Sequence, residues 1–489
     1  MKLADIIDTF ISGDWGEESP TLDTPNAAYC VRGADIVPIT NHNFTGIPQR
    51  YVCDRTKETK LLAVGDLVIE KSGGSPTQST GRIVYVSEDL IKAKGNVVCS
   101  NFCTAFRVKD GWNPLYVYYF WQNVYNHDAF FNFEGKTSGI KNLQLDNALS
   151  AIDIEYLPLE KQNQIIASLA SIDEKIKVNR QINDNLEAMA KQLYDYWFVQ
   201  FDFPNEEGKP YKSSGGAMVW NEKLKHQIPE GWEVKQLRDI IETNRGISYN
   251  TSSISGGGVP MINLASFNVD GSYKDAGLKS YNGNYTQEKI LKPFDLVLCN
   301  TQQTAIEFSK DIIGKAFLIP DIFDGDIVSS HHINTIKTEE VLKPYLAYLS
   351  NTYHFHKYAT GCCSGTNILG LDYNSFSQYK LEIPPKYLLK EFHDFIIDIV
   401  KRKSLIIKEN KLLTKQRNEL LPLLMNGQAT VNYHLSVVNV VARLPFYRRL
   451  PIFMYCFILL LLSRLSWYNK NVRLQEMGDV VKGVIKEVE

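Results

Sequence analysis

Two loops in the first half of the chain carry side chains whose chemistry suits contact with DNA. Lysine and arginine bind phosphates and guanine edges, whereas asparagine and glutamine suit adenine edges. These side chains are Lys71, Ser72, Ser75, Thr77, Gln78 and Arg82 in one loop, and Lys136, Thr137, Lys141 and Asn142 in the other. Matching places in the second half hold Asn300, Thr301, Gln302 and Gln303, followed by Thr366 and Asn367. Polar loops are commonly no more than solvated surface, and the DNA interpretation gains only because both halves place them between corresponding strands.

Motifs that would mark an enzyme are missing from the sequence. The glycine-rich stretch 72–76 lacks the Gly-Lys-Ser/Thr of a phosphate-binding loop, and no Asn/Asp-Pro-Pro-Tyr/Phe motif of an amino-methyltransferase occurs. Glu58 and Lys60 lack the preceding Pro-Asp that a nuclease site would need. His331 and His332 are adjacent on a predicted strand, so we expect them to point to opposite faces and not to share a metal ion. The sequence therefore predicts no catalytic and no metal site.

The composition fits a folded protein that is not strongly charged. The 489 residues carry 53 Lys and Arg against 55 Asp and Glu, a formal net charge of −2. Any phosphate contact must therefore come from local basic groups, and we expect Lys71, Arg82 and Lys136 to provide them. The eight cysteines form no Cys-x-x-Cys pair, and residues 1–30 show no signal-peptide pattern. We expect reduced thiols and a cytoplasmic location.

A long helix is predicted after Pro158, because neither proline nor glycine recurs before Pro204. Its apolar residues alternate in steps of four and three, which is a heptad seam and indicates a helix paired with another helix. The same seam returns near the end of the chain, where Phe392 takes the place of Ile165. We therefore expect the two helices to pack against each other as an antiparallel coiled coil.

Short blocks before each helix also repeat in the same order, which predicts a duplicated globular domain. Residues 3–7 are echoed by 237–241, and 66–68 by 295–297. The predicted fold class is α/β (α+β), with two domains in a pseudo-twofold arrangement, each followed by a long helix. The predicted boundaries are a first domain at 1–157, a helix at 158–203, a linker at 204–227, a second domain at 228–385, a helix at 386–427 and an atypical tail at 428–489. Strands are expected at 31–39, 61–70, 82–86, 97–108, 259–264, 294–299, 314–319 and 327–336, and a short helix at 114–127.

With these features in place, the chain resembles the specificity subunits of type I restriction–modification enzymes. The order of domain, helix, domain, helix carries the resemblance together with four segments, namely 154–162, 193–204, 228–232 and 420–428. The resemblance covers about residues 1–436. The first domain lacks the Pro-x-Gly-Trp lead found at 229–232. The tail lies outside the pattern, and its apolar core at 452–462 is too short to span a membrane.

The resemblance implies a subunit that does no chemistry and recognises a bipartite double-stranded DNA sequence with two target recognition domains. It implies two modification subunits and restriction subunits as partners. It also implies that S-adenosylmethionine, ATP and Mg belong to those partners, with no cofactor on this chain. Two alternatives stay open: a stand-alone DNA methyltransferase or nuclease, and a coiled-coil scaffold without a role in DNA binding.

The aromatic end of the first helix allows two interpretations. Tyr194, Trp197 and Phe198 are three large apolar side chains at a helix terminus. They would form either a docking face for a modification subunit or a core contact against the linker.

Overall fold

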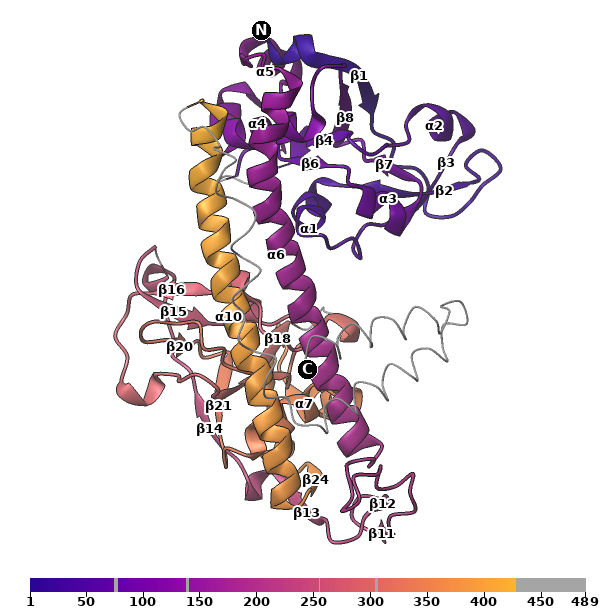
Figure 1. Ribbon diagram of the computed structural model, residues 1–489. Helices are drawn as coiled ribbons and strands as arrows, with labels where there is room; N and C mark the ends of the chain where they lie inside the picture. The colour runs from indigo at the N-terminus through magenta and orange to yellow at the C-terminus, as the bar shows by residue number, and fades with distance from the viewer. Residues whose placement is uncertain (74–77, 138–139, 255, 304–306, 428–489) are drawn as a thin grey trace, which may run out of the picture. The chain divides into compact units, whose positions relative to one another are not determined.

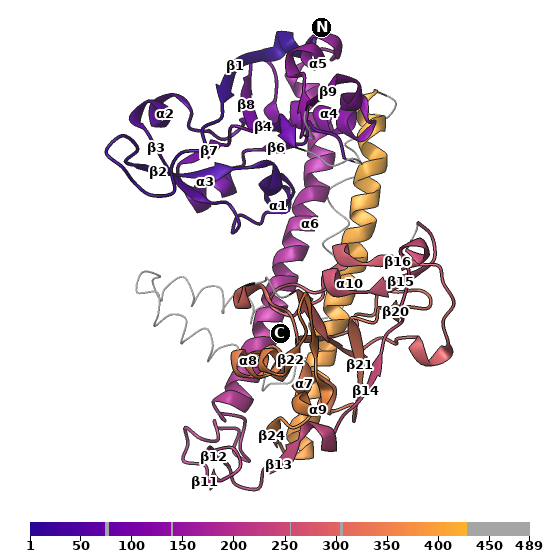
Figure 2. The same ribbon diagram turned by 180° about the vertical axis from the view of Figure 1, so that it is seen from behind.

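Two long helices organise the structure, a computed structural model that describes residues 1–73, 78–137, 140–254, 256–303 and 307–427. The helices α6 (Leu159–Tyr194) and α10 (Lys386–Met425) lie side by side in both views (Figure 1, Figure 2). Each begins directly after a proline, Pro158 or Pro385. A proline has no N–H group to leave unpaired at a helix start, where the first N–H groups lack intrahelical acceptors. The two long helices predicted from the heptad seam are confirmed.

Polar contacts between α6 and α10 fix their direction and register. Among these contacts are the pairs Asp173 with Arg417, Asn179 with Asn410, and Glu187 with Lys403. Because the partner number falls as the α6 number rises, the helices are antiparallel. Around these pairs the seam is apolar and buried, with Leu169, Ile176 and Ile399 each at most 4% exposed. A polar pair inside an apolar seam penalises any shifted register, since a shift would leave polar groups buried against hydrocarbon.

The first domain contains three small sheets. A four-stranded antiparallel sheet has the order β1-β8-β4-β6, and a second sheet, β3-β2-β7, contains one parallel pair, β2 with β7. Their strands are β1 (Ile7–Ser12), β2 (Asn26–Val31), β3 (Gln49–Val52), β4 (Leu67–Glu70), β6 (Ile83–Tyr85), β7 (Val97–Cys99) and β8 (Cys103–Val108). The third sheet, β5-β10-β9, joins β5 (Ser72–Gly73), β9 (Glu134–Thr137) and β10 (Ile140–Leu143). The helices are α1 (Ile36–Thr40), α2 (Asp54–Thr59), α3 (Glu88–Lys94), α4 (Pro114–Asn126) and α5 (Leu145–Ala151). Apolar side chains of the first two sheets, among them Val31, Val68 and Val84, form one buried core.

The second domain repeats this arrangement strand for strand. Its sheets have the orders β14-β21-β17-β19, β16-β15-β20 and β18-β23-β22, and again one pair is parallel, β15 with β20. The strands are β14 (Glu242–Arg245), β15 (Val259–Ile262), β16 (Lys279–Tyr281), β17 (Leu296–Cys299), β18 (Thr301–Gln303), β19 (Ala316–Leu318), β20 (Val328–Ser329), β21 (Ile333–Lys337), β22 (Cys363–Ser364) and β23 (Ile368–Leu371). The helices are α7 (Leu342–Ser350), α8 (Tyr353–Gly361) and α9 (Tyr373–Phe376), and β13 (Glu233–Gln236) pairs with β24 (Lys380–Ile383). The identical order and direction confirm the duplication.

A tyrosine from each domain reaches α6 beside an interhelical ion pair. The Tyr119 hydroxyl of α4 donates to Asp173 at 2.6 Å, and the Tyr348 hydroxyl of α7 donates to Glu187 at 3.3 Å. Each domain is therefore tied to the helix pair through a carboxylate that also binds a basic residue of α10.

Several expected segments differ in the structure. The strands expected at 97–108 and 327–336 are each divided in two by a turn. The strand predicted at 31–39 is wrong, because β2 ends at Val31 and α1 begins at Ile36. The Asp35 carboxylate accepts from the Arg32 N–H at 2.9 Å and from the Arg32 guanidinium at 2.8 Å, which closes a turn between them. The predicted linker contains a hairpin of β11 (Met218–Asn221) and β12 (His226–Pro229). The tail lies outside the described residues, among which no helix is long and apolar enough to cross a membrane.

Candidate nucleic-acid interface

The third sheet of each domain positions the polar loops that the sequence singled out. In the first domain the Leu143 N–H donates to the Lys71 carbonyl at 2.8 Å, directly before β5. In the second domain the Leu371 N–H donates to the Asn300 carbonyl at 2.9 Å, directly before β18. Lys71 and Asn300 are therefore equivalent positions of the repeated fold.

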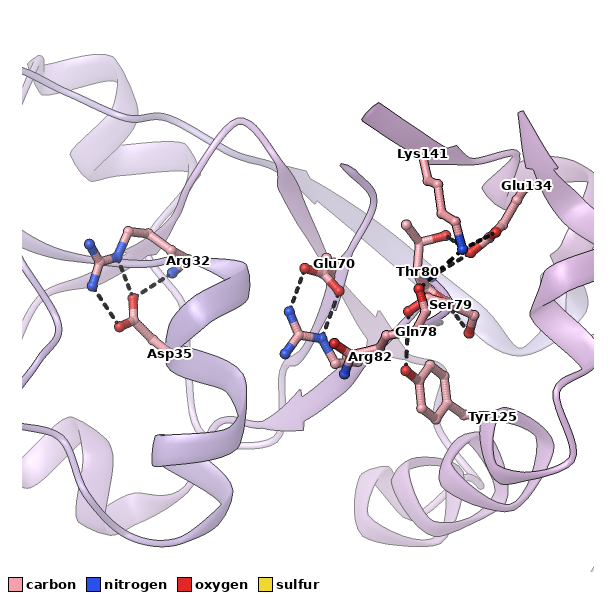
Figure 3. A network of polar contacts seen from close by, with 10 residues as sticks. All are labelled: Arg32, Asp35, Glu70, Gln78, Ser79, Thr80, Arg82, Tyr125, Glu134 and Lys141. Atoms are coloured by element: carbon pink, nitrogen blue, oxygen red, sulfur yellow. Dashed lines mark hydrogen bonds and ion pairs between the residues drawn. The ribbon is translucent and has the colours of Figure 1, made fainter. Parts of the chain in front are cut away.

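Arg82 is held inside the first domain by Glu70 (Figure 3). Its Nε donates to Glu70 Oε2 at 2.8 Å and its Nη2 donates to Glu70 Oε1 at 2.6 Å. The Glu70 side chain is only 3% exposed and that of Arg82 only 17%. Gly73 leaves room for this carboxylate, since a Cβ there would lie 2.7 Å from Glu70 Oε1. The expectation of a free phosphate ligand thus needs correction, because Arg82 neutralises a buried carboxylate.

Lys141 is also engaged internally, as Figure 3 shows. Its ammonium lies 3.1 Å from Glu134 Oε2 and donates to the Gln78 carbonyl at 3.2 Å. The Thr80 N–H donates to the same carboxylate at 2.6 Å. Burial alone would raise the pKa of Glu134, but the Thr80 N–H and the Lys141 ammonium outweigh burial and lower this pKa. Lys141 therefore fixes β10 to the loop and is largely occupied.

The remaining first-domain residues fall into three groups. Lys71 forms no ion pair within the described residues and stays a candidate phosphate ligand. The Ser72 hydroxyl donates to Asn142 Oδ1 across the β5–β10 pair, which orients both side chains. The Gln78 side chain is exposed. Some predictions lie outside the described residues: Ser75 and Thr77 entirely, and the side chains of Lys136 and Thr137.

In the second domain two of the predicted residues meet a histidine pair. Asn300 Nδ2 donates to the His331 carbonyl at 3.2 Å, and Thr301 Oγ1 lies 2.7 Å from His332 Nδ1. Asn300, Thr301 and Gln302 are buried at 7%, 7% and 6% exposure, and Asn300 Nδ2 also donates to Asn334 Oδ1 at 2.6 Å. The expectation that Asn300, Thr301 and Gln302 are exposed DNA contacts therefore needs correction, because their side chains lie inside the domain. The side chain of Gln303 lies outside the described residues, while Thr366 and Asn367 are exposed in the turn between β22 and β23.

The two histidines do not point to opposite faces, as a strand would require. They occupy a turn after β20, and their ring centroids are 3.8 Å apart. Burial, and secondarily His331, lowers the pKa of His332 to about 4, so its ring is neutral at pH 7. Among the described residues no cluster of His, Cys, Asp or Glu could hold a metal ion. Sequence reasoning did not anticipate the adjacent rings, because it assigned the two residues to a strand.

The aromatic side chains at the end of α6 and in the helical turn that follows it, residues 195–199, form a core. Tyr194, Trp197 and Phe198 are 3%, 9% and 2% exposed. The Phe198 ring lies 4.9 Å from that of Phe392 in α10 and 5.0 Å from that of Tyr345 in α7. The prediction of a docking face is corrected, because these side chains are covered by the chain itself.

The repeated domains and their helices coincide with two matches to one family model. The model describes the type I restriction modification DNA specificity domain, and it matches residues 38–188 and 229–419. The chain belongs to this family. The match confirms the resemblance to type I specificity subunits and the prediction of a specificity subunit with two target recognition domains.

Individual specificity subunits are similar over much of the chain. The type I restriction enzyme MjaIX specificity subunit of Methanocaldococcus jannaschii is 23% identical over 326 residues, which cover 66% of this chain and 71% of the relative. The HindI specificity subunit of Haemophilus influenzae is 22% identical, with 58% of this chain and 70% of the relative covered. The crystal structure of a type I S subunit from M. genitalium aligns with 87% of this chain and 95% of its own, at 12% identity and a TM-score of 0.47.

Proposed function

We propose that each target recognition domain of this chain reads one half of a bipartite double-stranded DNA site, and that the chain itself catalyses no reaction. The observation that carries this proposal is the pair of identical strand orders with different loop side chains at equivalent positions. A lysine at position 71 corresponds to an asparagine at position 300. Different side chains on equivalent loops of one scaffold would let the two domains read two different half-sites.

The partners in this proposal are two modification subunits and the restriction subunits. S-adenosylmethionine, ATP and Mg would be bound by those subunits, and this chain would direct them to the target. The similarity to the MjaIX and HindI specificity subunits of type I restriction enzymes supports this assignment.

A domain exchange tests independent reading of the two half-sites. Residues 228–385 are replaced by the matching domain of a relative, and the complex with modification subunits is allowed to methylate genomic DNA. Methylation-sensitive sequencing should show that one half of the target changes while the other half is retained. An exchange of residues 1–157 is the matched control and should change the other half. A simultaneous change of both halves would contradict independent reading.

The alternatives give different results with simple mixtures. A stand-alone methyltransferase would transfer a labelled methyl group to DNA without any partner. A scaffold without a DNA role would leave the modification subunits unable to select a sequence. We expect neither result.

A further inference from the structure

Two corresponding turns lie next to the predicted DNA-contacting loops, and their backbones are held in the same way. The first turn, residues 100–102, follows β7, and the second, residues 330–332, follows β20. The Ser100 N–H donates to the Val31 carbonyl at 2.9 Å, and the Ser330 N–H donates to the Ile262 carbonyl at 2.9 Å. In each turn the serine carbonyl then accepts from the N–H three residues later, again at 2.9 Å. Two backbone hydrogen bonds therefore hold the turn in the same way in both domains.

A glycine packs closely against the backbone of each turn. A Cβ on Gly13 would lie 1.9 Å from the Ser100 carbonyl oxygen, and one on Gly246 would lie 2.2 Å from the Ser330 carbonyl oxygen. Neither position could accept a side chain without moving the turn. Gly13 directly follows β1, and Gly246 directly follows the equivalent strand, β14. The close approach fixes each turn relative to its sheet.

Each turn is also bonded to the polar loop beside it. The Phe102 carbonyl accepts from the Lys71 N–H at 2.8 Å, and the His332 carbonyl accepts from the Asn300 N–H at 2.9 Å. Residues 102 and 332 therefore adjoin the first residue of the polar loop in each domain.

The side chains of the two turns differ. Phe102 is 57% exposed, on a turn whose backbone is fixed by the contacts above. At the equivalent place His332 bonds to Thr301, and His331 lies with its ring 5.6 Å from that of Tyr249.

The charges around the turns favour a nucleic acid over an apolar protein partner. Arg245 donates to the His331 carbonyl at 2.9 Å, and Lys279 donates to the Tyr249 hydroxyl at 3.4 Å. Neither Arg245 nor Lys279 forms an ion pair within the described residues, and the same holds for Lys71 beside Phe102. Basic groups without carboxylate partners around an aromatic or imidazole ring suit a base flanked by phosphates.

We propose that residues 100–102 and 330–332 are base-contacting turns, in which Phe102 makes an apolar contact with a base of the first half-site and the His331–His332 pair contacts a base of the second. This inference rests on the proposed function and adds specificity-determining residues to it. Phenylalanine can pack against the thymine methyl group or against an unstacked base, and neutral imidazole can donate or accept one hydrogen bond.

The test uses the full chain with its modification subunits, after the target has been read by methylation-sensitive sequencing. Binding of a labelled duplex is measured at several salt concentrations, for the target and for duplexes with single base changes in either half. Phe102→Ala should weaken binding to the target by about 10-fold or more, since a base contact of this kind is commonly worth that much. Discrimination should shrink only for changes in the first half-site, and the salt slope should stay the same, because no phosphate contact is lost.

Matched variants keep the result interpretable. Trp220→Ala removes an equally exposed aromatic ring, 57%, from the linker hairpin and should bind like the wild type. Phe102→Leu keeps an apolar side chain and should retain part of the lost affinity. His332→Ala should reduce discrimination in the second half-site alone.

Three results would overturn the inference. Phe102→Ala could bind and discriminate like the wild type, or it could lose affinity equally on all duplexes with a smaller salt slope, which would indicate a contact to the backbone. If the wild-type complex selects its target and the variants bind and discriminate in the same way as the wild type, the inference fails and the proposed function stands. A wild-type complex that does not select a sequence would contradict both the inference and the proposed function.

Discussion

The Phe198 side chain should determine the stability of the second half of the molecule and not its assembly with partners. Phe198 is 2% exposed, and its ring packs against those of Tyr345, Phe392 and Trp232 at centroid distances of 5.0, 4.9 and 6.2 Å. These rings come from α7, from α10 and from the segment before β13, so one side chain joins α6 to three other segments. Truncation to alanine removes the buried ring and leaves a cavity, which costs about 3–5 kcal/mol for a phenylalanine.

The assay is a melting curve together with an assembly measurement. For a unit of about 150–250 residues, 1 kcal/mol corresponds to roughly 2–4 °C, so Phe198→Ala should lower the Tm by roughly 6–20 °C. Trp220→Ala is the control, because a surface substitution away from special features usually changes stability by less than about 0.5 kcal/mol. At a temperature where Phe198→Ala is still folded, binding to the modification subunit should equal that of the wild type. An unchanged Tm with lost assembly would refute the core interpretation and restore the docking face.

Three further predictions concern charge and length. Arg82→Ala should destabilise the first domain by about 3–5 kcal/mol in urea unfolding, because it leaves the Glu70 carboxylate buried without a partner, and stability close to that of the wild type would refute the pairing argument. Lys71→Ala should weaken binding to all duplexes alike and reduce the slope of log K against log salt by about one, whereas an unchanged slope would make Lys71 a base reader. Four residues inserted after Ile176 lengthen α6 by about 6 Å between its contacts with the two domains, so the unread spacer in the methylated sequence should grow by one or two base pairs. Methylation of the original spacer alone would show that the helices do not set the spacing.

Sequence patterns predicted the elements whose signal is repeated or periodic. The heptad seam located α6 and α10, because one apolar face recurs over many turns, and the order of short blocks revealed the duplicated domain. The strand predicted at 31–39 failed for a local reason. The apolar run after Val31 looks like a strand, but Asp35 bonds to Arg32 and closes a turn that composition does not reveal.

The candidate interface was harder to predict from the sequence, because the identity of a polar residue does not show whether its side chain already has a partner in the fold. Arg82 binds Glu70, which belongs to β4, and Lys141 binds Glu134, which belongs to the neighbouring strand β9. The role of Phe102 was invisible for the opposite reason, since an apolar residue in a strand-rich segment is normally buried. Its exposure depends on a turn that only tertiary contacts fix.

The charges along the helix pair also limit how this chain could have arisen or could recombine. Asp173 and Glu187 of α6 pair with basic residues of α10, whereas Lys175 of α6 pairs with Glu409 of α10. In the repeat, the α6 residues that correspond to Arg417 and Lys403 are Ala190 and Ile176. A gene fusion of two identical first halves would therefore set Asp173 and Glu187 of both copies against hydrocarbon, with no basic group to neutralise them. The two halves have become complementary to each other and are no longer interchangeable, so recombination that shuffles recognition domains should preserve one helix of each kind.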